Sequence, residues 1–450
     1  MRKLILTAVG FVMFWSAVAQ EKTESNPISY GKLSGTFRNY YLGTYNKGNL
    51  KSFNAIASGL KLKYEYHFGE WLTLGGAMYS SLNWNVQDLT IADPTTGKLS
   101  RYESGLFDLE NRDDNFIAFP GELYAIFQLN QHQLTVGRMK IKSPMINPQD
   151  GRMIPTLEQG LWYKYADNGI LSKFQLGVFN AIAPRSSKGY FKIGNSLGVY
   201  PIGRGWDGKP SHYKGNTNSN YVMVANLQLQ PIKGVQWDTW NYYVDNIFNT
   251  LYSKGSWNIS DTKWQIAAEY MHQSKVGQGG NAIDSLKYYN QQNSNLWGIQ
   301  FSYKTKTGMF KLGYDRILPR GRFLFPREWG REDLFSFQKR ERSEGAADNK
   351  ALVFTYDMTT SFGKDKLRSI ISVGHQWKPS VLNPSENKYA MPSYAHFNLD
   401  LFYTTPKLAG LKPELLLVYK TGYNKYPDNM NFVINKVDLF QVNFIVNYTF

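Results

Sequence analysis

The last segment of the chain alternates between apolar and polar side chains up to the final residue. In residues 440–450, Phe440, Phe444 and Phe450 fall on one face, whereas Gln441 and Asn443 fall on the other. A period of two residues is typical of a β-strand with one apolar and one polar side. About ten tilted residues of this kind cross a bilayer, with the apolar side toward lipid. The segment therefore predicts a membrane-spanning strand of a closed β-barrel.

The amino terminus has the composition of a secretory signal peptide. Arg2 and Lys3 precede an apolar run over 4–15, and small residues follow up to Ala19. A charged start, a short apolar core and a small-residue cleavage site predict export and cleavage after Ala19. No other run of 18 apolar residues occurs in the sequence, so a helical anchor is not expected. We therefore expect a signal peptide over 1–19 and one outer-membrane β-barrel domain over 20–450.

The composition argues against several classes of protein. The chain has no cysteine, and its six histidines have no metal-binding spacing, so we expect no metal site and no cofactor. Nucleophile, phosphate-loop and dinucleotide motifs are also missing from the sequence, so we expect no enzyme. The net charge is +16, or +14 without Arg2 and Lys3 (16 − 2), which favours an anionic partner. Export argues against nucleic acid as this partner. The alternative explanation of the positive charge is that lysines and arginines lie on solvated loops that face lipopolysaccharide phosphates.

The chain from about residue 30 to its end is interpreted as eighteen strands whose connections alternate between short and long. Connections 69–70 and 130–132 are short and contain turn residues, whereas 87–114 and 182–218 are long. The link at 245–246 is short where a long one is due. This alternation predicts an all-β, transmembrane antiparallel β-barrel of about 18 strands, with periplasmic turns, external loops and both termini periplasmic. The expected strand starts are 30, 56, 71, 115, 133, 160, 170, 219, 235, 247, 263, 294, 308, 349, 367, 393, 411 and 438.

A barrel of eighteen strands encloses a lumen too wide for wall side chains to fill, so we expect water inside. In the first strand, Leu33 and Phe37 are assigned to the lipid face, which points Lys32 and Arg38 into the lumen. Arginine facing lipid near the midplane costs about 2–4 kcal/mol, so the inward direction is favoured. The alternative for Arg38 is a salt bridge to an acid on a neighbouring strand.

Two further basic segments are candidates for the solute path. The loop 141–159, flanked by Arg138, contains Arg152, three prolines and several large apolar residues. Such a stiff, apolar loop is expected to fold against the inner wall and form a constriction, although it could also cap other external loops. Segment 316–344 combines many arginines with acids, and the alternative there is that the charges pair with one another.

Four segments resemble the OprD-type outer-membrane porins: 38–41, 137–160 with its core 150–155, 242–252 and 326–331. This resemblance implies an eighteen-stranded monomeric barrel that passes small, mostly carboxylate-bearing solutes through a constriction of inward loops and basic side chains. It further implies that Asp150 and Arg152 lie in a pore-narrowing loop and that Arg38 faces the lumen. The predicted pore-lining set is Lys32, Arg38, Arg138, Asp150, Arg152, Arg316, Arg320 and Arg322.

We therefore expect passive, selective diffusion of small anionic solutes through a basic-lined pore in the Gram-negative outer membrane. The expected partners are outer-membrane lipid and lipopolysaccharide, small solutes, and the barrel-assembly machinery, because Phe450 resembles the terminal sorting signal of outer-membrane barrels. No nucleic-acid partner is expected. The alternative is a surface receptor or adhesin that uses the long loops 87–114, 182–218 and 273–293.

Overall fold

The computed structural model describes residues 31–149, 152–200 and 202–450, which form one antiparallel sheet that closes on itself. The sheet has 19 strands; the two-residue β8 pairs with the end of β7, and β7 also pairs with β9, so eighteen strands form the ring. Pairing of β1 with β19 closes it. The predicted eighteen-stranded barrel is thereby confirmed. The strands are β1 (Gly31–Asn46), β2 (Phe53–Phe68), β3 (Leu72–Asn83), β4 (Phe116–Leu129), β5 (His132–Met139), β6 (Leu157–Ala166), β7 (Leu171–Ala183), β8 (Phe191–Lys192), β9 (Val222–Leu229), β10 (Val235–Val244), β11 (Phe248–Asn258), β12 (Trp264–Lys275), β13 (Asn293–Lys304), β14 (Gly308–Ile317), β15 (Asn349–Phe362), β16 (Asp365–Trp377), β17 (Tyr394–Thr404), β18 (Leu411–Thr421) and β19 (Leu439–Thr449).

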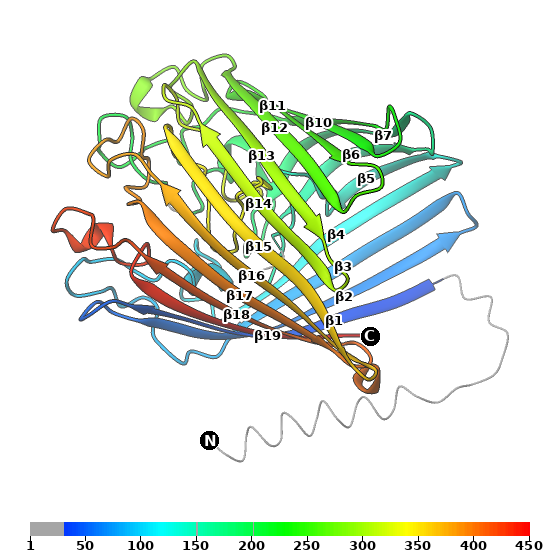
Figure 1. The fold of residues 1–450 in the computed structure, drawn as a ribbon, viewed down its shortest axis with the longest axis horizontal. Helices are drawn as coiled ribbons and strands as arrows, with labels where there is room; N and C mark the ends of the chain where they lie inside the picture. The colour runs from blue at the N-terminus through cyan, green and yellow to red at the C-terminus, as the bar shows by residue number, and fades with distance from the viewer. Residues whose placement is uncertain (1–30, 150–151, 201) are drawn as a thin grey trace.

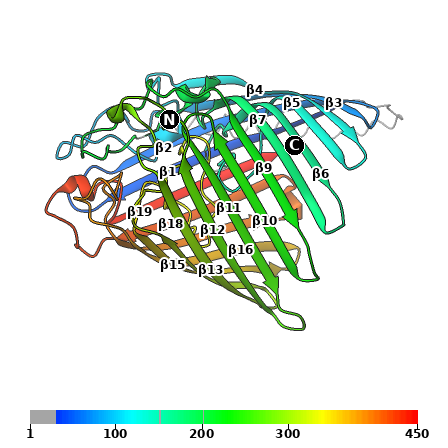
Figure 2. The same cartoon turned by 90° about the horizontal axis from the view of Figure 1, so that it is seen from above.

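The long connections gather at one end of the barrel and the short turns at the other (Figure 1, Figure 2). Each expected strand start lies within three residues of an observed one, and the short link at 245–247 is observed as well. We call the two ends of the barrel the loop end and the short-turn end. Both β1 and β19 have their free ends at the short-turn end. Among the described residues, no helix has the length and apolarity needed to cross a membrane.

The two faces of the sheet differ in the way that the sequence period predicts. In β19, Phe440 and Phe444 are exposed on the outside, whereas Gln441 and Asn443 between them are fully buried on the inside. Tryptophans cluster next to the short turns and are about half exposed on the outer surface, as in the aromatic belt of a membrane interface. They are Trp71, Trp237, Trp257 and Trp264.

The carboxyl terminus completes the seam between β1 and β19. The backbone N–H of Phe450 donates to the Gly35 carbonyl (3.1 Å), and the N–H of Gly35 donates to the Phe450 carbonyl (3.0 Å). The Phe450 ring lies directly over Gly35, where an added Cβ would be 2.3 Å from the ring. A glycine at position 35 therefore lets the last aromatic side chain cover the seam on the lipid side.

We predict that Phe450→Ala lowers the yield of folded barrel several-fold, because the seam loses its covering ring. Gly35→Val should have the same effect, because its side chain displaces the ring. The yield is measured as the fraction of protein that keeps the faster, heat-sensitive mobility of a folded barrel on a gel. Phe444→Ala, which removes another exposed aromatic of β19, is the control. Equal yields for Phe450→Ala and the unaltered chain would contradict this account.

Candidate functional site

The connection between β14 and β15, residues 318–348, runs along the inside of the barrel. The backbone N–H of Phe335 donates to Glu269 Oε1 of β12 (2.9 Å), and that of Ser336 donates to an Asp315 oxygen of β14 (2.6 Å). Its next side chains reach inward-facing groups of four more strands. Gln338 donates to Ser372 of β16 (3.1 Å), Lys339 pairs with Glu414 of β18 (2.6 Å), and Arg340 donates to Tyr40 of β1 and Asn443 of β19.

The connection between β5 and β6, residues 140–156, packs against the same interior. The backbone N–H of Met145 donates to the Tyr242 hydroxyl of β10 (3.3 Å), and Met145 and Ile146 are buried in an apolar cluster with Trp329. The N–H of Asn147 donates to the Trp329 carbonyl (3.2 Å). The two connections meet closely, since a Cβ on Gly330 would lie 1.9 Å from the Met145 carbonyl oxygen.

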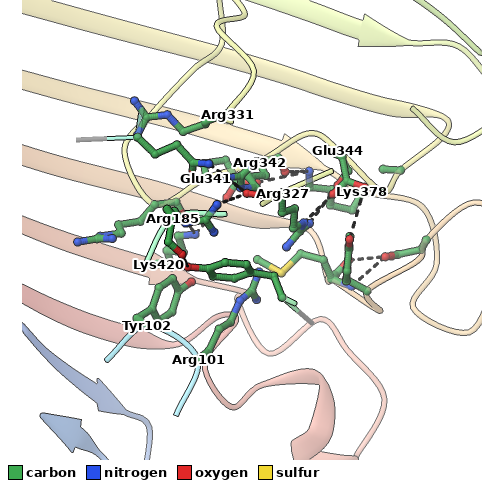
Figure 3. Close-up of a pocket in the computed structure, with 18 of the residues that line it drawn as sticks. Arg101, Tyr102, Arg185, Arg327, Arg331, Glu341, Arg342, Glu344, Lys378 and Lys420 are labelled. Atoms are coloured by element: carbon green, nitrogen blue, oxygen red, sulfur yellow. Dashed lines mark hydrogen bonds and ion pairs between the residues drawn. The ribbon is translucent and has the colours of Figure 1, made fainter. Parts of the chain in front are cut away.

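A cavity of about 120 Å³ lies where these connections meet the strand ends (Figure 3). We call it the inner cavity. Among the described residues, nine basic side chains line it, against two acidic ones, Glu341 and Glu344. The basic residues come from connections far apart in the sequence and from the loop ends of β16 and β18. The basic residues are Arg101, Arg152, Arg185, Arg327, Arg331, Arg340, Arg342, Lys378 and Lys420.

Part of this positive charge is neutralised within the cavity. Glu341 accepts from Lys420 (3.1 Å) and lies 3.5 Å from Lys378. Burial opposes ionisation of Glu341, but the two lysines outweigh it and lower its pKa to about 2. Arg327 pairs with Glu344 at 2.6 Å. Both carboxylates therefore anchor basic side chains of the cavity wall.

Other arginines of the inner cavity contact rings, carbonyls and amides. Arg185 stacks on Tyr200 at 3.7 Å, and Arg331 lies 4.1 Å from the Phe337 ring. Burial, together with neighbouring arginines such as Arg342, lowers the pKa of Arg185 to about 9 and that of Arg331 to about 10. In the described part of the chain, neither makes an ion pair with a carboxylate. The cavity therefore keeps an excess of positive charge.

A larger cavity of about 630 Å³ lies farther toward the loop end, and we call it the outer cavity. Connections 84–115, 184–221, 378–393 and 422–438 contribute to its wall. Arg101, Arg327 and Tyr389 line both cavities, so the two are adjacent. The outer cavity is lined by seven basic residues and, among described residues, by no acidic one. The seven are Lys98, Arg101, Arg112, Arg204, Arg327, Lys388 and Lys436.

Comparison with known proteins identifies the family. The family model described as "outer membrane porin, OprD family" matches residues 111–362, which is more than half of the chain. The chain belongs to the OprD family of outer-membrane porins. It is thus a multi-pass β-barrel of the Gram-negative outer membrane that passes small solutes, and the predicted family and location are confirmed. Porins are channels rather than enzymes. No curated protein matches this sequence.

Solved porin structures share the fold of this OprD-family porin at low sequence identity. Acinetobacter baumannii OccAB2 is 15% identical, with a TM-score of 0.67, covering 95% of this chain and 99% of its own. Pseudomonas aeruginosa OpdK with vanillate is 17% identical, with a TM-score of 0.67, covering 93% and 98%. Acinetobacter baumannii OccAB3 is 14% identical, with a TM-score of 0.69, covering 94% and 100%. At this identity the similarity concerns the fold.

Three of the predicted pore-lining residues of this porin lie in or near the two connections. Arg152 lines the inner cavity, and Arg38 of β1 donates to the Arg152 carbonyl and to Asn447 (2.7 Å). Arg138 of β5 donates to Gln159 (2.9 Å). The structure thus brings Arg38 and Arg152 together.

Four other predicted residues, all of them in the described part of the chain, do not line the inner cavity. Arg322 is fully buried against Trp206 at 3.5 Å, and Arg316 pairs with Asp348. Arg320 is exposed in the 318–348 connection, and Lys32 is exposed at the short-turn end. Asp150 and the predicted signal peptide 1–19 lie outside the described residues.

Sequence reasoning missed four basic residues of the inner cavity outside the singled-out segments: Arg101, Arg185, Lys378 and Lys420. Lys378 directly follows β16, Lys420 is the last residue but one of β18, and Arg185 comes two residues after β7. The signal that could have found these three is a basic residue at the loop end of a strand.

We predict that Gly330→Ala disturbs the junction of the two connections, because its Cβ would overlap the Met145 carbonyl. Overpacking of this kind costs about 1–3 kcal/mol. Single-channel recordings should show altered conductance and more current noise, and the 318–348 connection should become more sensitive to protease. Gly189→Ala is the matched control, because a Cβ there meets nothing within 4 Å. If Gly330→Ala behaves like Gly189→Ala, the connections are not in tight contact.

Proposed function

We propose that this porin conducts small anionic solutes, carboxylate-bearing ones among them, by passive diffusion through the inner cavity. The observation that carries the proposal is the lining of that cavity, where nine basic side chains of the described residues face two acidic ones, an excess of seven (9 − 2). A lumen lined by one sign of charge concentrates ions of the opposite sign. The planar guanidinium group also matches the fork of a carboxylate. Support from a relative comes from OpdK, whose structure was determined with vanillate.

Transport requires attraction that is strong enough for entry and weak enough for release. An exposed ion pair in water is worth about 1 kcal/mol or less, so several weak contacts in succession meet both conditions. In this proposal connections 140–156 and 318–348 form the constriction that sets the size limit. Their mutual contacts at Asn147 and Trp329 support a fixed rather than a mobile narrowing.

The proposal includes the orientation of the protein in its membrane. We infer that residues 20–450 form one barrel domain, with the loop end at the cell surface among lipopolysaccharide and the short-turn end in the periplasm. Phe450 would serve as the contact for the barrel-assembly machinery. The exposed position of its ring at the lipid-side seam supports that role. The mechanism needs no cofactor and no chemical step.

We predict that Arg152→Glu strongly lowers the preference of the channel for anions over cations, because it exchanges a positive for a negative group in the inner cavity. The preference is measured from reversal potentials in planar bilayers under a salt gradient. The change should persist near 1 M salt, where the Debye length is about 3 Å, because the cavity is narrow.

Arg320→Glu is the matched control for this experiment. It makes the same charge change in the 318–348 connection, but Arg320 is exposed and lies outside both cavities. Its selectivity should equal that of the unaltered porin at high salt. The proposed path through the inner cavity is wrong if Arg152→Glu leaves selectivity unchanged in folded, conducting channels.

We predict that anion preference decreases as the pH rises from 6 to 9. Burial, with Arg101 and Arg204 nearby, lowers the pKa of Lys436 from 10.5 to about 7. Burial, with Arg327 nearby, lowers that of Lys388 to about 8. Both lysines are therefore charged at pH 6 and lose their charge as the pH passes these values. Lys436→Gln should remove the part of the change centred near pH 7, and a flat profile for the unaltered porin would contradict the prediction.

A further inference from the structure

We propose that the outer cavity is a binding site for small multivalent anions, meaning solutes that carry two or more negative charges on separate oxyanion groups. This inference deepens the proposed anion-conducting function and rests on it. The chemical feature that these solutes share is a cluster of carboxylates or phosphates on one small molecule. The site is separate from the inner cavity in most of its lining, and it would capture the solute before the constriction.

The charge of the outer cavity is largely uncompensated by protein groups. Arg327, which pairs with Glu344, accounts for one of its seven basic residues. Arg204 donates to the carbonyls of Val381 (2.8 Å) and Asn387 (2.9 Å). For the six basic residues other than Arg327, Arg204 included, no ion pair with a carboxylate is found within residues 31–149, 152–200 and 202–450. A bound anion would supply the missing negative charge.

The basic groups converge from five different connections, one of which, 318–348, contributes Arg327. Lys98, Arg101 and Arg112 come from 84–115, and Arg204 comes from 184–221. The 378–393 and 422–438 connections contribute one lysine each, and asparagines of the latter add amide groups. An anion with one charge can neutralise one part of this wall at a time. An anion with several separated charges can contact several walls of a 630 Å³ cavity at once.

The positive groups of this cavity also act on one another. Lys436 lies among Arg101, Arg204 and Lys98, and their charges add to the effect of burial in disfavouring its ammonium form. Its Nζ donates to the carbonyls of Asn431 (2.8 Å) and Ala390 (3.2 Å), which fixes the group in place. A multivalent anion would relieve this repulsion. Because the inner cavity shares Arg101 and Arg327, the same anion could pass directly to the constriction.

The test is block of the chloride current through the purified porin in a planar bilayer of neutral lipid at 0.1 M KCl. Tripolyphosphate, citrate and the monovalent acetate are added on the loop side. We expect half-block by at least one multivalent anion at a concentration about tenfold or more below that for acetate, within the range by which charged clefts concentrate ions. Comparing tripolyphosphate with citrate distinguishes phosphate from carboxylate recognition.

The double variant Lys98→Gln/Arg112→Gln tests the location of the site, since both side chains are exposed and lie outside the inner cavity. It should raise the half-blocking concentration of the multivalent anion about tenfold while the channel stays anion-selective. Lys192→Gln/Lys425→Gln is the matched control, because these lysines are exposed and line neither cavity. The control should block like the unaltered porin.

Two results would overturn the inference and leave the proposed function intact. One is an anion-selective channel that acetate blocks as well as both multivalent anions do. The other is equal block of the Lys98/Arg112 double variant, its control and the unaltered porin. A cation-selective unaltered porin would instead overturn the proposed function itself, so the two failures are distinguishable.

Discussion

Closure of the sheet through the β1–β19 pair is the constraint on which the other features depend. The core of a bilayer contains no water, so each unpaired backbone N–H or C=O there costs several kcal/mol, and an open sheet edge is not tolerated. Closure satisfies these groups around the ring and assigns every second side chain to lipid. Once eighteen strands are closed, wall side chains cannot fill the interior, and the long connections have a space to occupy.

The acids of the interior serve as anchors for these connections. Glu269 and Asp315 accept from the backbone of the 318–348 connection, and Glu341 and Glu344 hold lysine and arginine side chains. Because carboxylates are used in this way, arginines such as Arg185 and Arg331 remain without a carboxylate partner among the described residues. The basic character of both cavities thus follows from how the negative charges of the scaffold are used.

The sequence predicts the barrel well because its signals are local. A period of two and turn residues locate strands to within three residues, and the alternation of short and long connections fixes which end carries the loops. The site is harder to predict because side chains in irregular connections do not alternate between two faces, as they do in a strand. Arg322 stacks on Trp206, more than a hundred residues earlier, and Lys378 and Lys420 contact Glu341 from distant parts of the sequence. Such contacts depend on tertiary structure, and the sequence of a single segment does not indicate them.

Conduction of anions through the two cavities depends on the sign of the charge that a permeating solute meets. The most direct test is the reversal potential of the purified, unaltered porin in a planar bilayer under a tenfold KCl gradient. We expect open channels whose reversal potential shifts toward the chloride equilibrium potential. A shift toward the potassium equilibrium potential in conducting channels would contradict it, because the arginines and lysines of the two cavities would then not face the path.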